Sequence, residues 1–128
     1  MKNTLLFALM IFAGTHAFAY TDQKDIASCF GIFNAHINAG GQMSTGNQRL
    51  IDKNADFYNK KVKIIAKKVL DCRGSDTSSA NHKACAESLS APDLEIYRAY
   101  NSGVNQYLGI KQQGDSTKLG VILLACSA

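Results

Sequence analysis

The sequence has none of the short motifs that identify common enzymes. It contains no G-x-S-x-G, H-E-x-x-H, P-loop or G-x-G-x-x-G pattern. Histidine is scarce, and beyond residue 19 only His36 and His82 occur. Acidic pairs at helical spacing, such as Asp52 and Asp56, have lysines beside them, whereas a glycosidase-like pair needs one carboxyl group removed from water. We therefore expect a non-enzymatic protein with no catalytic residues and no cofactor.

Other absences limit the class of protein. The 128 residues include one proline and no tryptophan, and 46% are apolar against 19% charged. This balance excludes a disordered, collagen-like or coiled-coil chain, and the length allows one domain. No run alternates with period two long enough for a sheet, and there is no internal repeat.

The first nineteen residues follow the pattern of a secretory signal peptide. Lys2 gives a positive start, residues 5–13 form an apolar run, and Ala17-Phe18-Ala19 resembles a cleavage site. The apolar run is too short to span a bilayer, which takes about 20 residues. Cleavage near Ala19 would leave residues 20–128 as a single helical domain, periplasmic or secreted.

The four cysteines predict two disulfides, as is usual in an oxidising compartment. Of the three possible pairings we favour Cys72–Cys85, which closes a short polar loop, and Cys29–Cys126, which ties the first helix to the last. No pair has C-x-x-C spacing and neither histidine lies at ligand spacing from two cysteines, so no metal site is expected.

Apolar periodicity predicts helices throughout the remaining chain. The expected helices cover residues 22–39, 47–72, 82–89, a long segment that follows Ser90, and 117–126. Ser90 and Ser116 are the expected N-caps of the last two. The final helix is apolar on all sides, which predicts that it is buried. The predicted fold is all-α, a small bundle of four to five helices stapled by two disulfides.

Charge is distributed unevenly along the chain. Residues 49–73 hold eight basic and three acidic residues, whereas the rest of the chain beyond residue 19 sums to −2. On the helix predicted for this segment one apolar line faces the bundle: Ile51, Tyr58, Val62, Ile65 and Val69. A second line (Leu50, Phe57 and Ile64) lies opposite, bordered by Lys53, Lys60 and Lys67 on one edge and Lys61 and Lys68 on the other. Either another helix covers this second line, or it is exposed as a docking surface.

The leading functional prediction is an inhibitor-like or immunity-like module that docks an acidic protein. An apolar centre with a charged rim suits such a partner. The predicted contact residues are Lys53, Phe57, Lys60, Ile64 and Lys67. Nucleic acid is not expected as a partner, because lysine lacks the planar guanidinium fork of arginine and because the predicted compartment, periplasmic or extracellular, does not suit a nucleic-acid-binding protein. Binding to a membrane surface is less favoured, because it requires that the second apolar line be exposed to solvent.

The alternative prediction is a carrier of small ligands. Tyr97, Tyr100 and Tyr107 lie on one helix and would form an aromatic pocket against the first helix, near His36. Ordinary core packing with the hydroxyl groups at the rim is the competing interpretation. His82, at the corner between a loop and a helix, is expected to be exposed.

Overall fold

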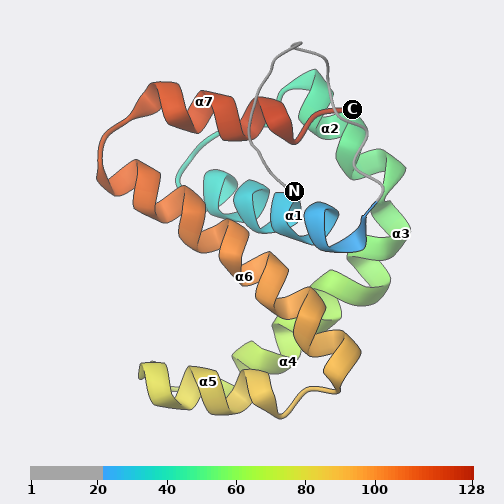
Figure 1. The fold of residues 1–128 in the computed structure, drawn as a ribbon, viewed down its shortest axis with the longest axis vertical. Helices are drawn as coiled ribbons and strands as arrows, with labels where there is room; N and C mark the ends of the chain where they lie inside the picture. The colour runs from blue at the N-terminus through green and yellow to red at the C-terminus, as the bar shows by residue number, and fades with distance from the viewer. Residues whose placement is uncertain (1–21) are drawn as a thin grey trace.

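The computed structural model describes residues 22–128, and within this range every regular element is a helix. The predicted all-α bundle with two disulfides is therefore confirmed. In chain order the elements are α1 (Gln23–Asn38), α2 (Thr45–Lys53), α3 (Ala55–Phe57), a π-helical turn η1 (Tyr58–Val62), α4 (Lys63–Arg73), α5 (Ser79–Glu87), α6 (Ala91–Gln112) and α7 (Ser116–Ala125) (Figure 1). The predicted signal peptide lies outside the described residues.

Short polar side chains begin the helices. Four helices begin with a side chain that accepts a hydrogen bond from a backbone N–H of the first turn: Asp22, Ser44, Ser78 and Ser90. Each of these bonds satisfies a donor that has no partner inside the helix. Ser90 is the cap predicted for α6. The predicted cap of α7 is wrong by one residue, because Asp115 rather than Ser116 accepts from the N–H of Lys118.

The centre of the molecule is the crossing of α1 and α6 (Figure 1). A Cβ atom at Gly31 would overlap the carbonyl oxygen of Tyr100, and one at Gly103 would overlap that of Ser28. Glycine therefore lets the two backbones touch. Around this crossing lie the large buried side chains of the core, which include Phe30, Phe33, Leu50, Val62, Ile65, Val69 and Tyr107.

The long helix predicted over residues 47–72 is interrupted at Asn54. This residue ends α2 with φ −119° and ψ 25°, and its side-chain amide donates to the carbonyl of Leu50 at 2.9 Å. Asn47 of α2 donates to the carbonyl oxygens of Leu123 and Cys126 at 2.8 and 3.1 Å. The break thus allows α2 to lie against the end of α7 while α4 packs on the other side of the bundle.

The two disulfides join the predicted cysteines and lie at opposite ends of the bundle. Cys29–Cys126 links α1 to the end of α7, and Cys72–Cys85 links α4 to α5. Figure 1 shows α2 and α7 at the top of the view and α4 and α5 at the bottom, with α1 and α6 between them. The pair of disulfides indicates an oxidising compartment.

The prediction that the last helix is buried is wrong. α7 contains no fully buried residue, and Val121 and Leu124 are 62% and 70% exposed. Its inner side, with Leu119, Ile122 and Leu123, packs against the core. An all-round apolar pattern does not reveal that neighbouring helices cover only one side.

No helix within residues 22–128 has both the length and the apolar character needed to cross a membrane.

Candidate functional site

The outer face of α4 carries an exposed apolar side chain among lysines. Val62, Ile65 and Val69 point into the core, which turns Ile64 outward with 48% of its surface exposed. Side chains three and four residues away lie beside a given residue on a helix. The positions three and four residues from Ile64 are all exposed lysines: Lys67 and Lys68 follow it on α4, and Lys60 and Lys61 precede it in the π turn η1. We call these four residues and Ile64 the lysine ring.

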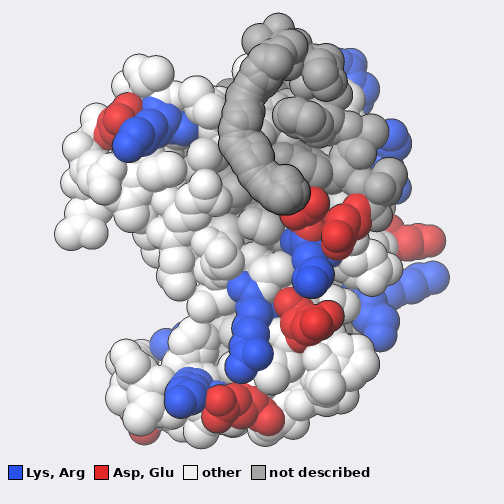
Figure 2. All heavy atoms as spheres, in the orientation of Figure 1, with Lys and Arg blue, Asp and Glu red and all other residues white. Residues whose placement is uncertain are grey.

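Two lysines of the ring have acidic neighbours. Lys67 lies 2.7 Å from Asp71, and Lys61 lies 3.9 Å from Asp93 of α6. For Lys60 and Lys68 no carboxylate of residues 22–128 lies within ion-pair distance. Exposed pairs contribute only about 0–1 kcal/mol, so an acidic partner could replace even the two that form. In Figure 2 lysine and arginine side chains also gather along the right-hand edge, where Figure 1 places α2 and α3.

The predicted second apolar line is not a continuous open stripe. Leu50 is only 1% exposed and belongs to the core. Phe57, in the three-residue helix α3, is half-buried and packs against that core. Of the predicted line, Ile64 is thus the residue that lies exposed; Leu70 of α4, which is not part of that line, is 63% exposed. The predicted lysines Lys53, Lys60 and Lys67 are all exposed.

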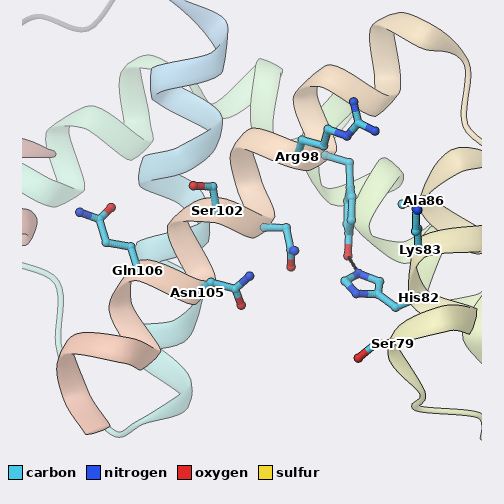
Figure 3. Close-up of a pocket in the computed structure, with 10 residues that line it drawn as sticks. Ser79, His82, Lys83, Ala86, Arg98, Ser102, Asn105 and Gln106 are labelled. Atoms are coloured by element: carbon cyan, nitrogen blue, oxygen red, sulfur yellow. Dashed lines mark hydrogen bonds between the residues drawn. The ribbon is translucent and has the colours of Figure 1, made fainter. Parts of the chain in front are cut away.

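A polar cleft of about 710 Å³ lies between α5 and α6 (Figure 3). Its lining residues are Ser79, His82, Lys83, Ala86, Tyr97, Arg98, Asn101, Ser102, Asn105 and Gln106. The Nε2 atom of His82 lies 2.7 Å from the hydroxyl of Tyr97. The expectation that His82 is exposed is wrong, because this contact leaves it half-buried. The lining offers cations, amides and hydroxyl groups but no carboxylate.

A second cavity, of about 380 Å³, lies between α1, α4 and α6. Tyr97 and Tyr100 line it, as the aromatic-pocket hypothesis requires. Tyr107 and His36 do not: Tyr107 is buried in the core, and its hydroxyl lies 2.8 Å from Nδ1 of His36. The glycine crossing also closes the direct interface between α1 and α6, so the cavity lies beside it, where α4 completes the wall.

The two tyrosines of this cavity present neutral hydroxyl groups. Burial raises the pKa of both Tyr97 and Tyr100; the charge of Arg73 opposes this at Tyr97, and a hydrogen bond from Asn34 opposes it at Tyr100. The Asn34 amide donates to Tyr100 at 2.8 Å and to Tyr58 at 3.4 Å. Tyr100 therefore keeps its own proton available for donation, whereas the hydroxyl of Tyr97 is engaged with Nε2 of His82.

Within residues 22–128 there is no group of three or more His, Cys, Asp or Glu side chains that could hold a metal ion.

Comparison with protein-family models, curated proteins and solved structures gives no match. The case for a function therefore depends on the geometry of these surfaces. Sequence reasoning identified the lysines of the ring, Ile64 and the tyrosines. It missed Arg73 and Asn34, because no periodic pattern shows that residues from three separate helices line one cavity.

Proposed function

We propose that this protein is an exported, non-enzymatic binding protein that docks an acidic protein partner through the lysine ring. The observation that carries the proposal is Ile64, 48% exposed and surrounded by four exposed lysines. An apolar centre supplies affinity once it is desolvated, and a cationic rim steers an acidic partner toward it. Lys53 at the end of α2 and the half-buried Phe57 would extend the contact toward α2.

Export is supported by two independent observations. The disulfides form readily only where the environment is oxidising. The sequence of residues 1–19 has the charge, apolar length and small-residue pattern of a signal peptide, with cleavage expected near Ala19. We propose a periplasmic or secreted protein, in which the bundle meets its partner outside the cytoplasm.

Charge reversal within the ring tests the docking proposal. The partner is first captured from the exported fraction and identified, and its Kd is then measured at low and high salt. We expect Lys60→Glu/Lys67→Glu to weaken binding by more than about tenfold and to flatten its salt dependence, because rim charges act mainly on steering. The matched control, Lys24→Glu/Lys118→Glu, makes the same change in net charge at exposed positions on α1 and α7. Equal effects of the two double variants would contradict the proposal.

The apolar centre is tested separately. Ile64→Ser should weaken binding, whereas Leu124→Ser, at a more exposed apolar position on α7, should not. Vesicles with anionic lipids form a second arm of the experiment. Binding to vesicles that is lost in the same ring variants would identify a membrane surface in place of a protein partner.

A specific observation also supports the second candidate, a carrier of small ligands. Tyr97 and Tyr100 line a cavity of about 380 Å³, which is within the usual size range of small-molecule sites.

A further inference from the structure

The cavity between α1, α4 and α6 is lined by both polar and apolar side chains. Its lining residues are Asn34, Ala35 and Asn38 from α1, Ala66, Lys67, Val69, Leu70 and Arg73 from α4, and Tyr97, Tyr100, Asn101 and Val104 from α6. No carboxylate is among them. A ligand in this cavity would meet amide and phenol groups, aliphatic side chains and two cations.

Arg73 is the lining cation without an ion pair among residues 22–128, although its charge, after the hydrogen bonds from Ser78, helps to lower the pKa of the nearby Asp76 carboxyl group. Its Nε atom is buried without an acceptor among residues 22–128, and no carboxylate of that range lies within ion-pair distance of its guanidinium. An arginine does not relieve this cost by losing its proton, and a buried donor left without an acceptor is expensive. Lys67, by contrast, is largely exposed and already has a carboxylate neighbour, Asp71, at 2.7 Å.

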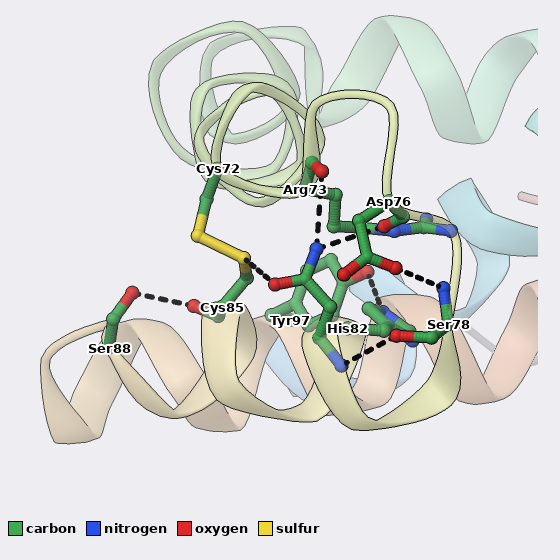
Figure 4. Close-up of a disulfide and its surroundings, with 9 residues drawn as sticks. Cys72, Arg73, Asp76, Ser78, His82, Cys85, Ser88 and Tyr97 are labelled. Carbon is green, nitrogen blue, oxygen red and sulfur yellow. Dashed lines mark hydrogen bonds between the residues drawn. A yellow bond between two sulfur atoms is a disulfide. The ribbon is translucent and has the colours of Figure 1, made fainter.

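The backbone of Arg73 is held firmly in place (Figure 4). The preceding residue, Cys72, is bonded to Cys85 of α5. The side-chain amide of Asn81 donates to the carbonyl oxygens of Arg73 and Asp76 at 3.1 and 2.9 Å. The end of α4 is therefore fixed to α5, which gives Arg73, a lining residue of the cavity, a rigid support.

We propose that this cavity binds a small monocarboxylate with an aromatic or aliphatic body, with its carboxylate on Arg73 and its body against Tyr97, Tyr100 and Val104. The guanidinium fork matches a carboxylate with two parallel hydrogen bonds. The hydroxyl of Tyr100, which accepts from Asn34, has its own proton free to donate. A single uncommitted cation suits a monoanion better than a phosphate group, whose charge near neutral pH is about −1.5 to −2. This inference rests on the carrier function and names its ligand class; Lys67 belongs to both the cavity lining and the lysine ring, but the carboxylate is assigned to Arg73.

The test compares 3-phenylpropanoate with its uncharged amide by calorimetric and NMR titration of the oxidised protein. We expect the acid to bind at least about tenfold more tightly than the amide, as a charge-assisted hydrogen bond requires. Arg73→Gln should abolish this preference, while the matched control Arg98→Gln, on α6 outside the cavity lining, should retain it. Ala66→Leu, which fills the cavity and leaves Arg73 in place, should weaken both compounds. Circular dichroism and thermal unfolding of each variant check that the fold is kept.

The other outcomes distinguish a failure of this inference from a failure of the carrier function. If acid and amide bind equally and Ala66→Leu weakens both, the cavity binds ligands but the carboxylate class is wrong. If inorganic phosphate displaces the acid at similar concentrations, Arg73 belongs to a phosphate site and the inference is overturned. If Ala66→Leu changes nothing, or if neither compound binds the wild-type protein, both the inference and the carrier function fail.

Discussion

At the scale of single residues, glycine has opposite effects at two places on the same helix. Gly103 of α6 faces the backbone of α1 so closely that a Cβ atom would overlap the Ser28 carbonyl. Gly109, six residues later, has nothing within 4 Å of the position of a Cβ atom. The first is required by the helix crossing, whereas the second only weakens the helix. The sequence alone gives the same residue at both places, so only the packing separates them.

Alanine at these two positions should shift stability in opposite directions. Gly103→Ala should lower the free energy of unfolding by about 1–3 kcal/mol or more, because rigid backbone must move apart. Gly109→Ala should raise it by about 0.5–1 kcal/mol, because alanine favours the helix. Urea unfolding followed by circular dichroism measures both. A lower stability of Gly109→Ala would contradict this prediction, because it would mean that a neighbouring group occupies the position of the Cβ atom.

The buried phenols should make the fold sensitive to alkali. Burial raises the pKa of Tyr97 and Tyr100 in the folded state above the ordinary value of 10.0. The unfolded chain therefore loses these protons first, so their contribution is fully present below pH 10.0 and is lost as pH rises through the folded-state values. In Tyr97→Phe/Tyr100→Phe we expect lower stability near neutral pH, from lost hydrogen bonds, but a shallower decline above pH 10.0. The measurement is the urea midpoint of unfolding across this pH range, together with the absorbance of tyrosinate. An equally steep decline of stability in the double variant would contradict the assignment of the alkaline sensitivity to these two phenols.

At the scale of elements, the start of α6 was predictable, the starts predicted at residues 47 and 82 lie two and three residues after those of α2 and α5, and the neighbours of each helix were not predictable. The caps act within a few residues, so Ser90 could be recognised from sequence, and Asp115 differs from the predicted cap by one position. The exposed side of α7 and the turn at Asn54 depend on which other helices lie near. Periodicity reports which face of a helix is apolar, but it carries no information about what covers that face.

Each disulfide should stabilise a different part of the bundle. The only fully buried residue of α5 is Cys85 itself, so Cys72→Ala/Cys85→Ala should release α5 while α1 and α6 stay protected. Cys29 and Cys126 are both buried in the core, so their replacement by alanine should destabilise the whole bundle. From the sequence separations of 13 and 97 we expect losses of about 3 and 4.7 kcal/mol.

Hydrogen exchange measured by mass spectrometry separates local from global effects. Faster exchange confined to α5 in the first double variant, and spread over all helices in the second, is the expected result. Uniformly faster exchange in both variants would show that α5 unfolds only with the rest of the molecule.

At the scale of the whole molecule, the sequence predicted the fold class, the disulfide pairing and the basic segment. All three depend on composition, spacing or local pattern. The cleft and the contact of His82 with Tyr97 depend on α5 meeting α6, and the cavity that Arg73 lines depends on three helices meeting. No local signal in the sequence encodes either meeting. The lysine ring is intermediate: its spacing could be recognised from sequence, but the exposure of Ile64 required the structure.

The crossing of α1 and α6 also bears on how the chain folds. Asn34 and Tyr100, which meet beside this crossing, are 66 residues apart in the sequence. The largest interface of the molecule therefore forms only after a long loop closes, and the entropy of that closure must be overcome before any contact compensates for it. Every regular element of residues 22–128 is a helix, yet the central contact joins residues far apart in the sequence, as the strand pairings of many slowly folding β-sheet proteins do.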